Sequence, residues 1–238
     1  MDIWQDEGII LSVRPHSEKG GIASILTRDH GRHAGYVFGA RSSRMRGSLE
    51  MGNFVSVEWQ SRVSENLGNY KVELNKSHVA VLMDDPRKLV ALQSACALAD
   101  KTLAERDKHQ SVYEGLRALL EAFETEVWSA AYIYWEMGLL KELGFGLDLT
   151  VCAATGNTDN LIYVSPKSGR AVSAEAGEIY KEKLLKLPGF LRGESDVSDQ
   201  EILNGLDMTA YFLQHRVFST MNIGLPDARL RLAQHYTA

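Results

Sequence analysis

The chain has 238 residues, of which 45% are hydrophobic and 24% charged, and its net charge at pH 7 is −5. This length fits one large domain or two modest ones, and the composition excludes a disordered or low-complexity chain. No apolar run approaches the roughly 20 residues that span a bilayer. The N-terminal sequence MDIWQDEG also carries acids where a signal peptide needs basic residues. We therefore expect a cytoplasmic protein that does not contact membranes.

Charge is distributed unevenly along the chain. Residues 1–78 hold 10 Lys and Arg against 9 Asp and Glu, a balance of +1. The remaining residues hold 16 basic against 22 acidic side chains, a balance of −6. This asymmetry predicts two parts with different partners.

The first eighty residues alternate short apolar segments with turns. Strands are predicted at residues 8–13, 22–27, 36–38, 54–59 and 70–74. Pro15 ends the first strand, and Asp29-His30-Gly31 supplies turn residues before the third. Five short strands in about eighty residues predict a small barrel, and the five-stranded oligonucleotide-binding barrel (OB-fold) is the candidate.

Helical signals begin at Asp85, which can cap a helix, and Pro86, which suits its first position. Helices are predicted at residues 86–103, 112–123, 127–143, 198–218 and from 226 onward. A hairpin is predicted within residues 161–173. The fold class is therefore α+β: an OB-fold barrel domain over residues 1–80, then a helical domain over residues 81–238 with a small hairpin insert at about 150–176.

The stretch GARSSRMRG, residues 39–47, concentrates arginine in an acidic protein. Its spacing suits neither a regular helical face nor a buried strand. Within residues 28–46 the only acid is Asp29. Guanidinium groups suit bidentate phosphate contact, and the flanking glycines and two serines allow close approach and further donors. The predicted DNA-binding residues are Arg28, Arg32, Arg41, Arg44 and Arg46. The alternative is that these are ordinary surface arginines between strands.

No catalytic motif accompanies this basic segment. The sequence contains no G-x-S-x-G, P-loop or H-E-x-x-H pattern. His30 and His33 lack a carboxylate or thiol cluster, so we expect them to be surface residues of a turn that shares the basic patch. The prediction is a protein that is not an enzyme and that needs no cofactor.

Two sets of aromatic residues have both a structural and a functional interpretation. Residues 128–137 are apolar on most sides, which predicts a buried central helix; the alternative is that one edge lines a groove for a partner peptide. Tyr36, Phe38 and Trp59 could stack on bases. Because strand aromatics of a small barrel more often belong to its core, they are left out of the predicted site.

Four segments in this order resemble the RecO family of bacterial DNA repair and recombination mediators. They are WxxxxIILSxRP, GARSSRMRGxLE, WEMGLLKELGFGLDL and LPDARLRL, and the resemblance covers essentially the whole chain. It implies a mediator, without covalent chemistry, that binds single- and double-stranded DNA and anneals complementary strands. With RecR, such proteins help load RecA onto strands coated by single-stranded-DNA-binding protein, whose acidic C-terminal tail they contact. A cytoplasmic protein that joins the nucleoid when DNA-bound is expected.

The insert departs from the zinc-bearing members of that family, which carry one Cys-x-x-Cys on each side of the hairpin. The four corresponding positions here are Cys152, Thr155, Ser173 and Ala176. A structural zinc site needs about four ligands, so we expect no metal. Cys152 is then a remnant packed in the insert, Cys96 is a core residue of an apolar helix, and both are expected to be free thiols.

The resemblance also implies a pocket for the acidic tail along WEMGLLKEL. The candidate residues are Met137, Leu139, Lys141 and Leu143. Ile133 and Tyr134 stand where basic residues are expected, and the apolar candidates could equally be core. The rival function is a protein-interaction scaffold whose barrel does not bind nucleic acid.

Overall fold

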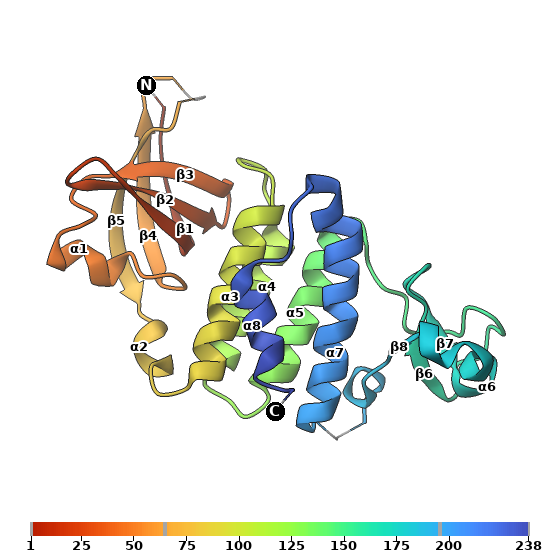
Figure 1. Cartoon of the computed structure of the whole chain (residues 1–238). Coiled ribbons are helices and arrows are strands. Elements are labelled where there is room, and N and C mark those ends of the chain that lie inside the picture. Colours follow the sequence, from red (N-terminus) through yellow and green to blue (C-terminus); the bar gives the residue numbers. More distant parts are fainter. Residues whose placement is uncertain (1, 64–65, 195–196, 238) are drawn as a thin grey trace. The chain divides into compact units, whose positions relative to one another are not determined.

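A computed structural model of the chain describes residues 2–63, 66–194 and 197–237 (Figure 1). It divides into two compact units, residues 1–124 and 125–238. The first unit contains the barrel together with helices α1 to α4, so it extends beyond the predicted barrel domain. No helix among the described residues is both long enough and apolar enough to cross a membrane.

Five strands close the predicted barrel. They are β1 (Asp2–His16), β2 (Gly20–Thr27), β3 (Gly31–Val37), β4 (Phe54–Ser61) and β5 (Asn69–Lys76). Their order around the barrel is β1-β2-β3-β5-β4, in which β3 and β5 run parallel and the other pairs are antiparallel. This is the OB-fold arrangement, so the predicted fold class is confirmed.

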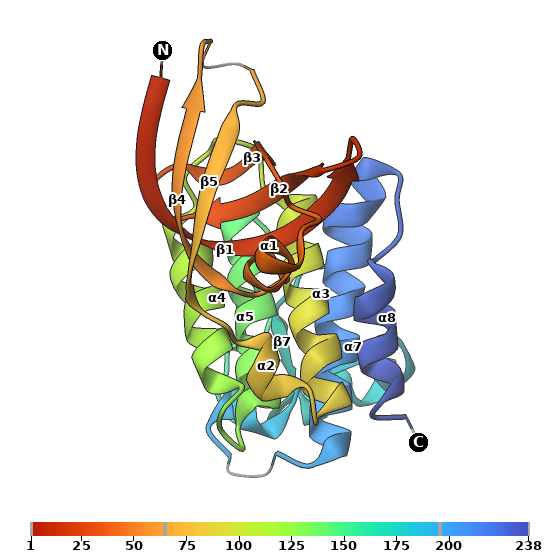
Figure 2. The ribbon, with the colours of Figure 1, turned by 90° about the vertical axis from the view of Figure 1, so that its left-hand side faces the viewer.

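The first strand is longer than predicted, and it is strongly curved (Figure 2). It begins at Asp2, which pairs with Ser61 of β4, and passes Pro15 to end at His16. A register shift between Ile10 and Ser12 marks an irregularity of the bulge type. Bulges bend a strand and increase its twist, so a single strand can pair with β4 in its first half and with β2 in its second.

The third strand begins at Gly31, five residues before its predicted start, so His33 lies within the strand and not in the preceding turn. Every second residue of β3 from Gly31 to Val37 is buried, and this places His33 inside, with 4% of its surface exposed. The expectation that His33 is a surface residue of a turn was therefore wrong. Burial lowers the pKa of His33, while its hydrogen bond to the Ala34 carbonyl partly opposes that shift.

The first unit also contains α2 (Val79–Leu82), α3 (Pro86–Thr102) and α4 (Gln110–Ala122). Asp85 caps α3 as predicted, accepting hydrogen bonds from the backbone of residues 87 and 88. One end of α3 contacts β1 and β2, where Asp100 accepts hydrogen bonds from Ser12 Oγ (2.9 Å) and Ser24 Oγ (2.5 Å). Gly52, at φ +85°, allows the segment before β4 to pack closely against α3, because an added Cβ would lie 2.6 Å from the Leu92 side chain.

The second unit is built from α5 (Trp128–Glu142), α7 (Asp199–Phe212) and α8 (Asp227–Gln234). After α7 the chain continues as the π-helical turn η3 (Leu213–Val217) and the 3-10 turn η4 (Phe218–Met221). Gly144 ends the predicted helix at φ +85°, and Ser198 caps α7 by accepting from the backbone N–H of Glu201. The predicted helices of this unit are therefore confirmed.

The insert contains the predicted hairpin of β6 (Leu161–Val164) and β7 (Ala171–Ser173). A third strand, β8 (Leu185–Lys186), pairs with β6 and was not predicted, because two residues give no recognisable pattern. Short helical turns complete the insert: α6 (Ala174–Gly177), η1 (Glu178–Lys183) and η2 (Gly189–Arg192).

The buried central helix predicted at residues 128–137 is α5, and it contains a buried ion pair that the sequence did not predict. Glu136 and Arg229 have side chains 0% and 1% exposed, and Arg229 Nη2 lies 3.0 Å from Glu136 Oε2. Tyr132 and Thr209 also donate to the carboxylate. Burial alone would lower the pKa of Arg229, but its interactions with Glu136, Tyr132 and Asp207 together raise that pKa. The ion pair of Glu136 and Arg229 therefore links α8 to α5.

Candidate nucleic-acid interface

The arginine-rich segment forms a short helix, α1 (Ser43–Ser48), between β3 and β4. Ser42 caps it, since its side chain accepts a hydrogen bond from the backbone N–H of Met45 (3.3 Å). Gly39 has a φ of +69° in the preceding turn. The expectation that this spacing suits no helix was wrong. One capped turn needs no apolar stripe, and α1 buries none of its residues.

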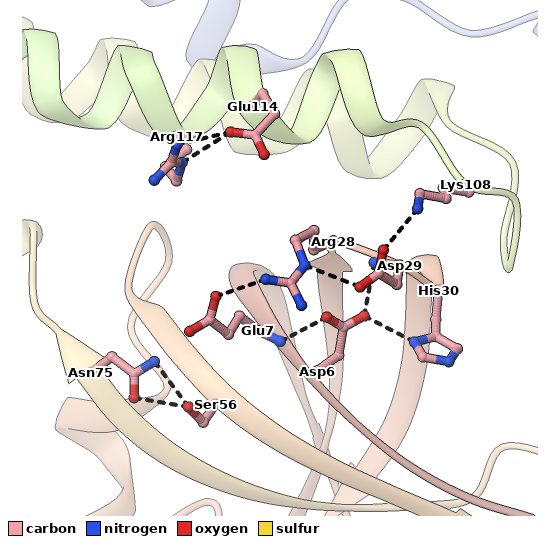
Figure 3. Close-up of polar contacts among 10 residues, drawn as sticks. All are labelled: Asp6, Glu7, Arg28, Asp29, His30, Ser56, Asn75, Lys108, Glu114 and Arg117. Carbon is pink, nitrogen blue, oxygen red and sulfur yellow. Dashed lines mark hydrogen bonds and ion pairs between the residues drawn. The ribbon is translucent and has the colours of Figure 1, made fainter.

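Two of the five predicted arginines are held by carboxylates. Arg28 contacts Glu7 (3.5 Å) and Asp29 (3.0 Å), as Figure 3 shows. Arg32 donates to the carbonyl of Leu103 (2.9 Å) and lies 3.6 Å from Asp100. Both side chains therefore link parts of the first unit to one another.

The other three predicted arginines, Arg41, Arg44 and Arg46, lie on the α1 segment and are exposed. Among the described residues, no carboxylate forms an ion pair with any of them. Arg44 and Arg28 line one groove of about 810 Å³, together with residues of β1, β4 and β5. That groove also contains the acids Asp6, Glu7, Glu58 and Glu73, so its charge is mixed.

Arg41 lies at a different part of the barrel. Its Nη1 is 3.5 Å from the carbonyl of Glu18, in the turn between β1 and β2. This turn borders an open cleft of about 710 Å³, whose other side is the β4–β5 segment. The residues that line this cleft are His16, Ser17, Tyr36, Ser61, Arg62, Asn66, Leu67, Gly68 and Asn69. Of the five predicted arginines, Arg28 and Arg44 line one groove, while Arg41 contacts the β1–β2 turn.

One half-buried aromatic side chain of β3 lies at this cleft beside Arg62. Tyr36 lines it, in edge contact with His16 (ring centroids 6.0 Å apart), and its hydroxyl lies 3.3 Å from Ser17 Oγ. Phe38, two residues later, is 77% exposed. Trp59, by contrast, is 2% exposed and belongs to the barrel core. The expectation that these aromatics belong to the barrel core is confirmed for Trp59 and wrong for Phe38, while Tyr36 is half-buried and lines the cleft.

Arg62 and the exposed Lys19 were also missing from the predicted set. The signal that could have identified these two cations is the strand topology. In OB-folds the loops between strands 1 and 2 and between strands 4 and 5 border the oligonucleotide site. Both cations lie in or beside these two loops. Local arginine density drew the prediction to α1 instead.

The insert brings together the four positions that correspond to zinc ligands. The Cys152 thiol donates to Ser173 Oγ (3.5 Å) and accepts from the Ser173 backbone N–H (3.3 Å), while the Ala176 N–H reaches Ser173 Oγ. Burial alone would raise the pKa of Cys152, but hydrogen bonds with Ser173 and Thr155 lower it to about 6. Among the described residues, no three His, Cys, Asp or Glu side chains are grouped to hold a metal.

The predicted tail-binding residues divide between core and surface. Leu139 is 1% exposed and packs inside the second unit, Met137 and Leu143 are half-buried, and Lys141 is exposed. Directly after α5, a small hollow of about 170 Å³ is lined by residues 144–147 together with Phe212 and Arg216. Cys96, the other predicted core residue, is fully buried, which raises the pKa of its thiol.

The strand order and the cleft place the first unit in the class of oligonucleotide-binding-barrel proteins. The family described as "Recombination protein O N terminal" matches residues 1–78, and "Recombination protein O C terminal" matches residues 83–222. The DNA repair protein RecO of Rhodospirillum centenum is 49% identical over 98% of this chain and 94% of its own length. Those of Rhodospirillum rubrum (43%; 97% and 95%) and Caulobacter vibrioides NA1000 (44%; 96% and 95%) are also similar.

The chain therefore belongs to the RecO family of DNA repair and recombination proteins.

Proposed function

We propose that this protein is a DNA-binding recombination mediator without catalytic activity. It binds single- and double-stranded DNA, anneals complementary strands, and with RecR helps load RecA onto strands coated by single-stranded-DNA-binding protein. The observation that carries the proposal is the cleft between the β1–β2 turn and the β4–β5 segment, with Tyr36 and Arg62 in its lining. An aromatic platform beside cations is how proteins bind single strands with little sequence preference.

Two kinds of contact at the barrel suit two forms of DNA. Aromatic rings such as Phe38 stack only on unpaired bases, so they favour single strands. The guanidinium groups of Arg41, Arg44 and Arg46 contact phosphates, which both forms carry. Because Arg44 lines the 810 Å³ groove and Arg41 contacts the β1–β2 turn, phosphates of two strands can be neutralised at different parts of one barrel. This lowers the repulsion between the strands and accelerates annealing without bond chemistry.

The second unit is the proposed site for the acidic tail of single-stranded-DNA-binding protein. Lys141 supplies an exposed cation, and Met137 and Leu143 supply half-buried apolar surface. The neighbouring hollow combines Phe212 with Arg216, a pairing that fits an apolar side chain next to a carboxylate. Leu139 supports this surface from within the core.

Fluorescence anisotropy with labelled single-stranded and duplex DNA tests the proposal. Phe38→Ala removes a side chain that is 77% exposed, so the fold is expected to tolerate it. Stacking contributes about 1–3 kcal/mol per base, so binding to single strands should weaken about 5- to 150-fold while duplex binding changes little. Tyr180→Ala, which removes an aromatic residue 57% exposed in the second unit, is the matched control.

Equal binding of single strands by the parent and the Phe38→Ala variant would show that Phe38 does not stack on bases. If the parent retains no DNA at moderate salt, the barrel does not bind nucleic acid and the scaffold function replaces the mediator function.

A further inference from the structure

A stack of aromatic rings lies on another side of the β4–β5 segment. The Trp4 ring lies between two others: His30 stacks on it at a centroid distance of 4.0 Å and an interplanar angle of 6°, and Trp59 at 5.5 Å and 16°. His33 contacts both tryptophans edge-on. The order of the stack is therefore Trp59, Trp4, His30, with His30 as its outermost ring.

His30 is held rigidly in this position. Its Nδ1 lies 2.9 Å from Oδ2 of Asp6, a carboxylate whose side chain is 1% exposed (Figure 3). Asp6 also accepts hydrogen bonds from the backbone N–H groups of Glu7 and Asp29, both at 2.8 Å. About a third of the His30 side chain is exposed. Because Trp4 covers one face of the ring and Asp6 binds one edge, the exposed part lies on the opposite face and the outer edge.

The His30 ring opens into a pocket of about 370 Å³, a size within the range of small-ligand sites. The other lining residues are Asp2, Trp4, Asp29, His33, Trp59, Arg106 and Lys108. Two cations and two carboxylates balance one another at the rim, and Lys108 contacts Asp29 at 2.7 Å. The pocket therefore offers a flat aromatic surface in a nearly neutral setting, which favours a planar ring over a bare phosphate.

The pocket adjoins the cleft proposed for single-stranded DNA. Trp59 Nε1 donates to the carbonyl of Leu67 (3.1 Å), and Arg106 Nη2 donates to that of Asn66 (2.8 Å). Trp59 and Arg106 line the pocket, while Asn66 and Leu67 line the cleft, so the two sites lie on either side of one short segment.

We propose that this pocket binds one nucleobase of single-stranded DNA, stacked on His30, as the strand leaves the cleft beside Tyr36. The inference rests on the proposed function, because the strand enters from the proposed cleft. His30 extends an existing aromatic stack, and its bond to Asp6 orients the ring before the base arrives, which reduces the ordering cost of binding. Recognition by stacking is tolerant of base identity.

Two substitutions separate the ring from the hydrogen bond. His30→Gln keeps a side-chain donor for Asp6 but removes the aromatic surface, and His30→Phe keeps the surface but removes the donor. The probe is a single-stranded oligothymidylate with one 2-aminopurine, whose fluorescence falls when the base stacks. Anisotropy of the same strand gives its affinity, and thermal unfolding by circular dichroism verifies that each variant is folded.

We expect the Gln variant to weaken binding about 5- to 150-fold and to lose part of the fluorescence quenching, with the Phe variant close to the parent. Because stacking displaces few ions, this loss should be similar at low and high salt. A Gln variant that binds and quenches like the parent would overturn the inference, as would equal loss in both variants, which would indicate a structural role for the Asp6 bond. If Phe38→Ala still weakens binding in either case, the proposed function stands without this pocket.

Discussion

The salt dependence of DNA binding gives the sharpest test of the α1 arginines. Arg41, Arg44 and Arg46 are exposed and form no ion pair among the described residues, whereas Arg28 and Arg32 are already near carboxylates. An arginine that is already neutralised releases few further ions when it meets a phosphate. The perturbation is therefore the triple variant Arg41→Ala, Arg44→Ala, Arg46→Ala.

The expected magnitude follows from three phosphate contacts. Each contact contributes about −0.9 to the slope of log K against log salt on duplex DNA and about −0.7 on single strands. The triple variant should flatten these slopes by about 2.7 and 2.1. Between about 50 and 200 mM salt, the parent should lose about 40-fold more duplex affinity than the variant, and about 18-fold more affinity for a single strand. Annealing should slow in parallel.

The assay is fluorescence anisotropy across a salt series, with strand annealing followed by a paired-dye signal. The control is a variant with both Arg28→Ala and Arg117→Ala, which removes two exposed arginines that are already paired with Glu7, Asp29 and Glu114. We expect its slopes to equal those of the parent. A triple variant with parental slopes, or a control that flattens them as strongly, would refute the assignment of the phosphate contacts to α1.

Three further predictions concern the fold. Arg229→Met leaves the Glu136 carboxylate buried and unpaired, so the free energy of unfolding by denaturant should fall by about 3–5 kcal/mol. Adding Glu136→Leu should recover most of this loss, and a single variant as stable as the parent would contradict the prediction. Metal analysis should find no zinc in the parent but one zinc per chain after Thr155→Cys, Ser173→Cys and Ala176→Cys. Thr155 and Ser173 already hydrogen-bond with Cys152, and the Ala176 N–H reaches Ser173 Oγ. A triple variant without zinc would show that the geometry is wrong. Burial lowers the pKa of His33 below 6.5, so the contribution of neutral His33 to stability should be complete above about pH 6.5 and should decline as the pH falls through the lowered pKa. A folded His33→Gln variant should therefore show a flatter pH profile of unfolding free energy in that range.

A fourth prediction concerns the partner tail. Leu139→Ala is a poor test because Leu139 is buried and its truncation alone should cost about 2–5 kcal/mol. Lys141→Ala and Arg216→Ala should instead weaken binding of an acidic tail peptide measured by calorimetry, with the exposed Lys183→Ala as the control. Peptide affinity unchanged in both variants would place the pocket elsewhere.

The sequence alone determined the barrel, the helices and the family. Strand alternation at residues 54–59 predicted β4, and Asp85 with Pro86 predicted the start of α3, because these signals depend on local backbone chemistry. Four ordered segments were enough to indicate the RecO family. The resemblance to that family also identified the four positions that correspond to zinc ligands.

Only the tertiary structure decided which side chains are available for binding. Arg32 looks identical to Arg44 in the sequence, yet its carboxylate neighbour Asp100 comes from α3, 68 residues away. Arg28 likewise contacts Glu7 of β1 in addition to the adjacent Asp29. Burial of Glu136 depends on Arg229, 93 residues away. The stack of Trp4, His30 and Trp59 likewise joins three separate strands and turns. Closure of the barrel brings these residues together, and no local pattern records which charges it pairs or which rings it leaves exposed.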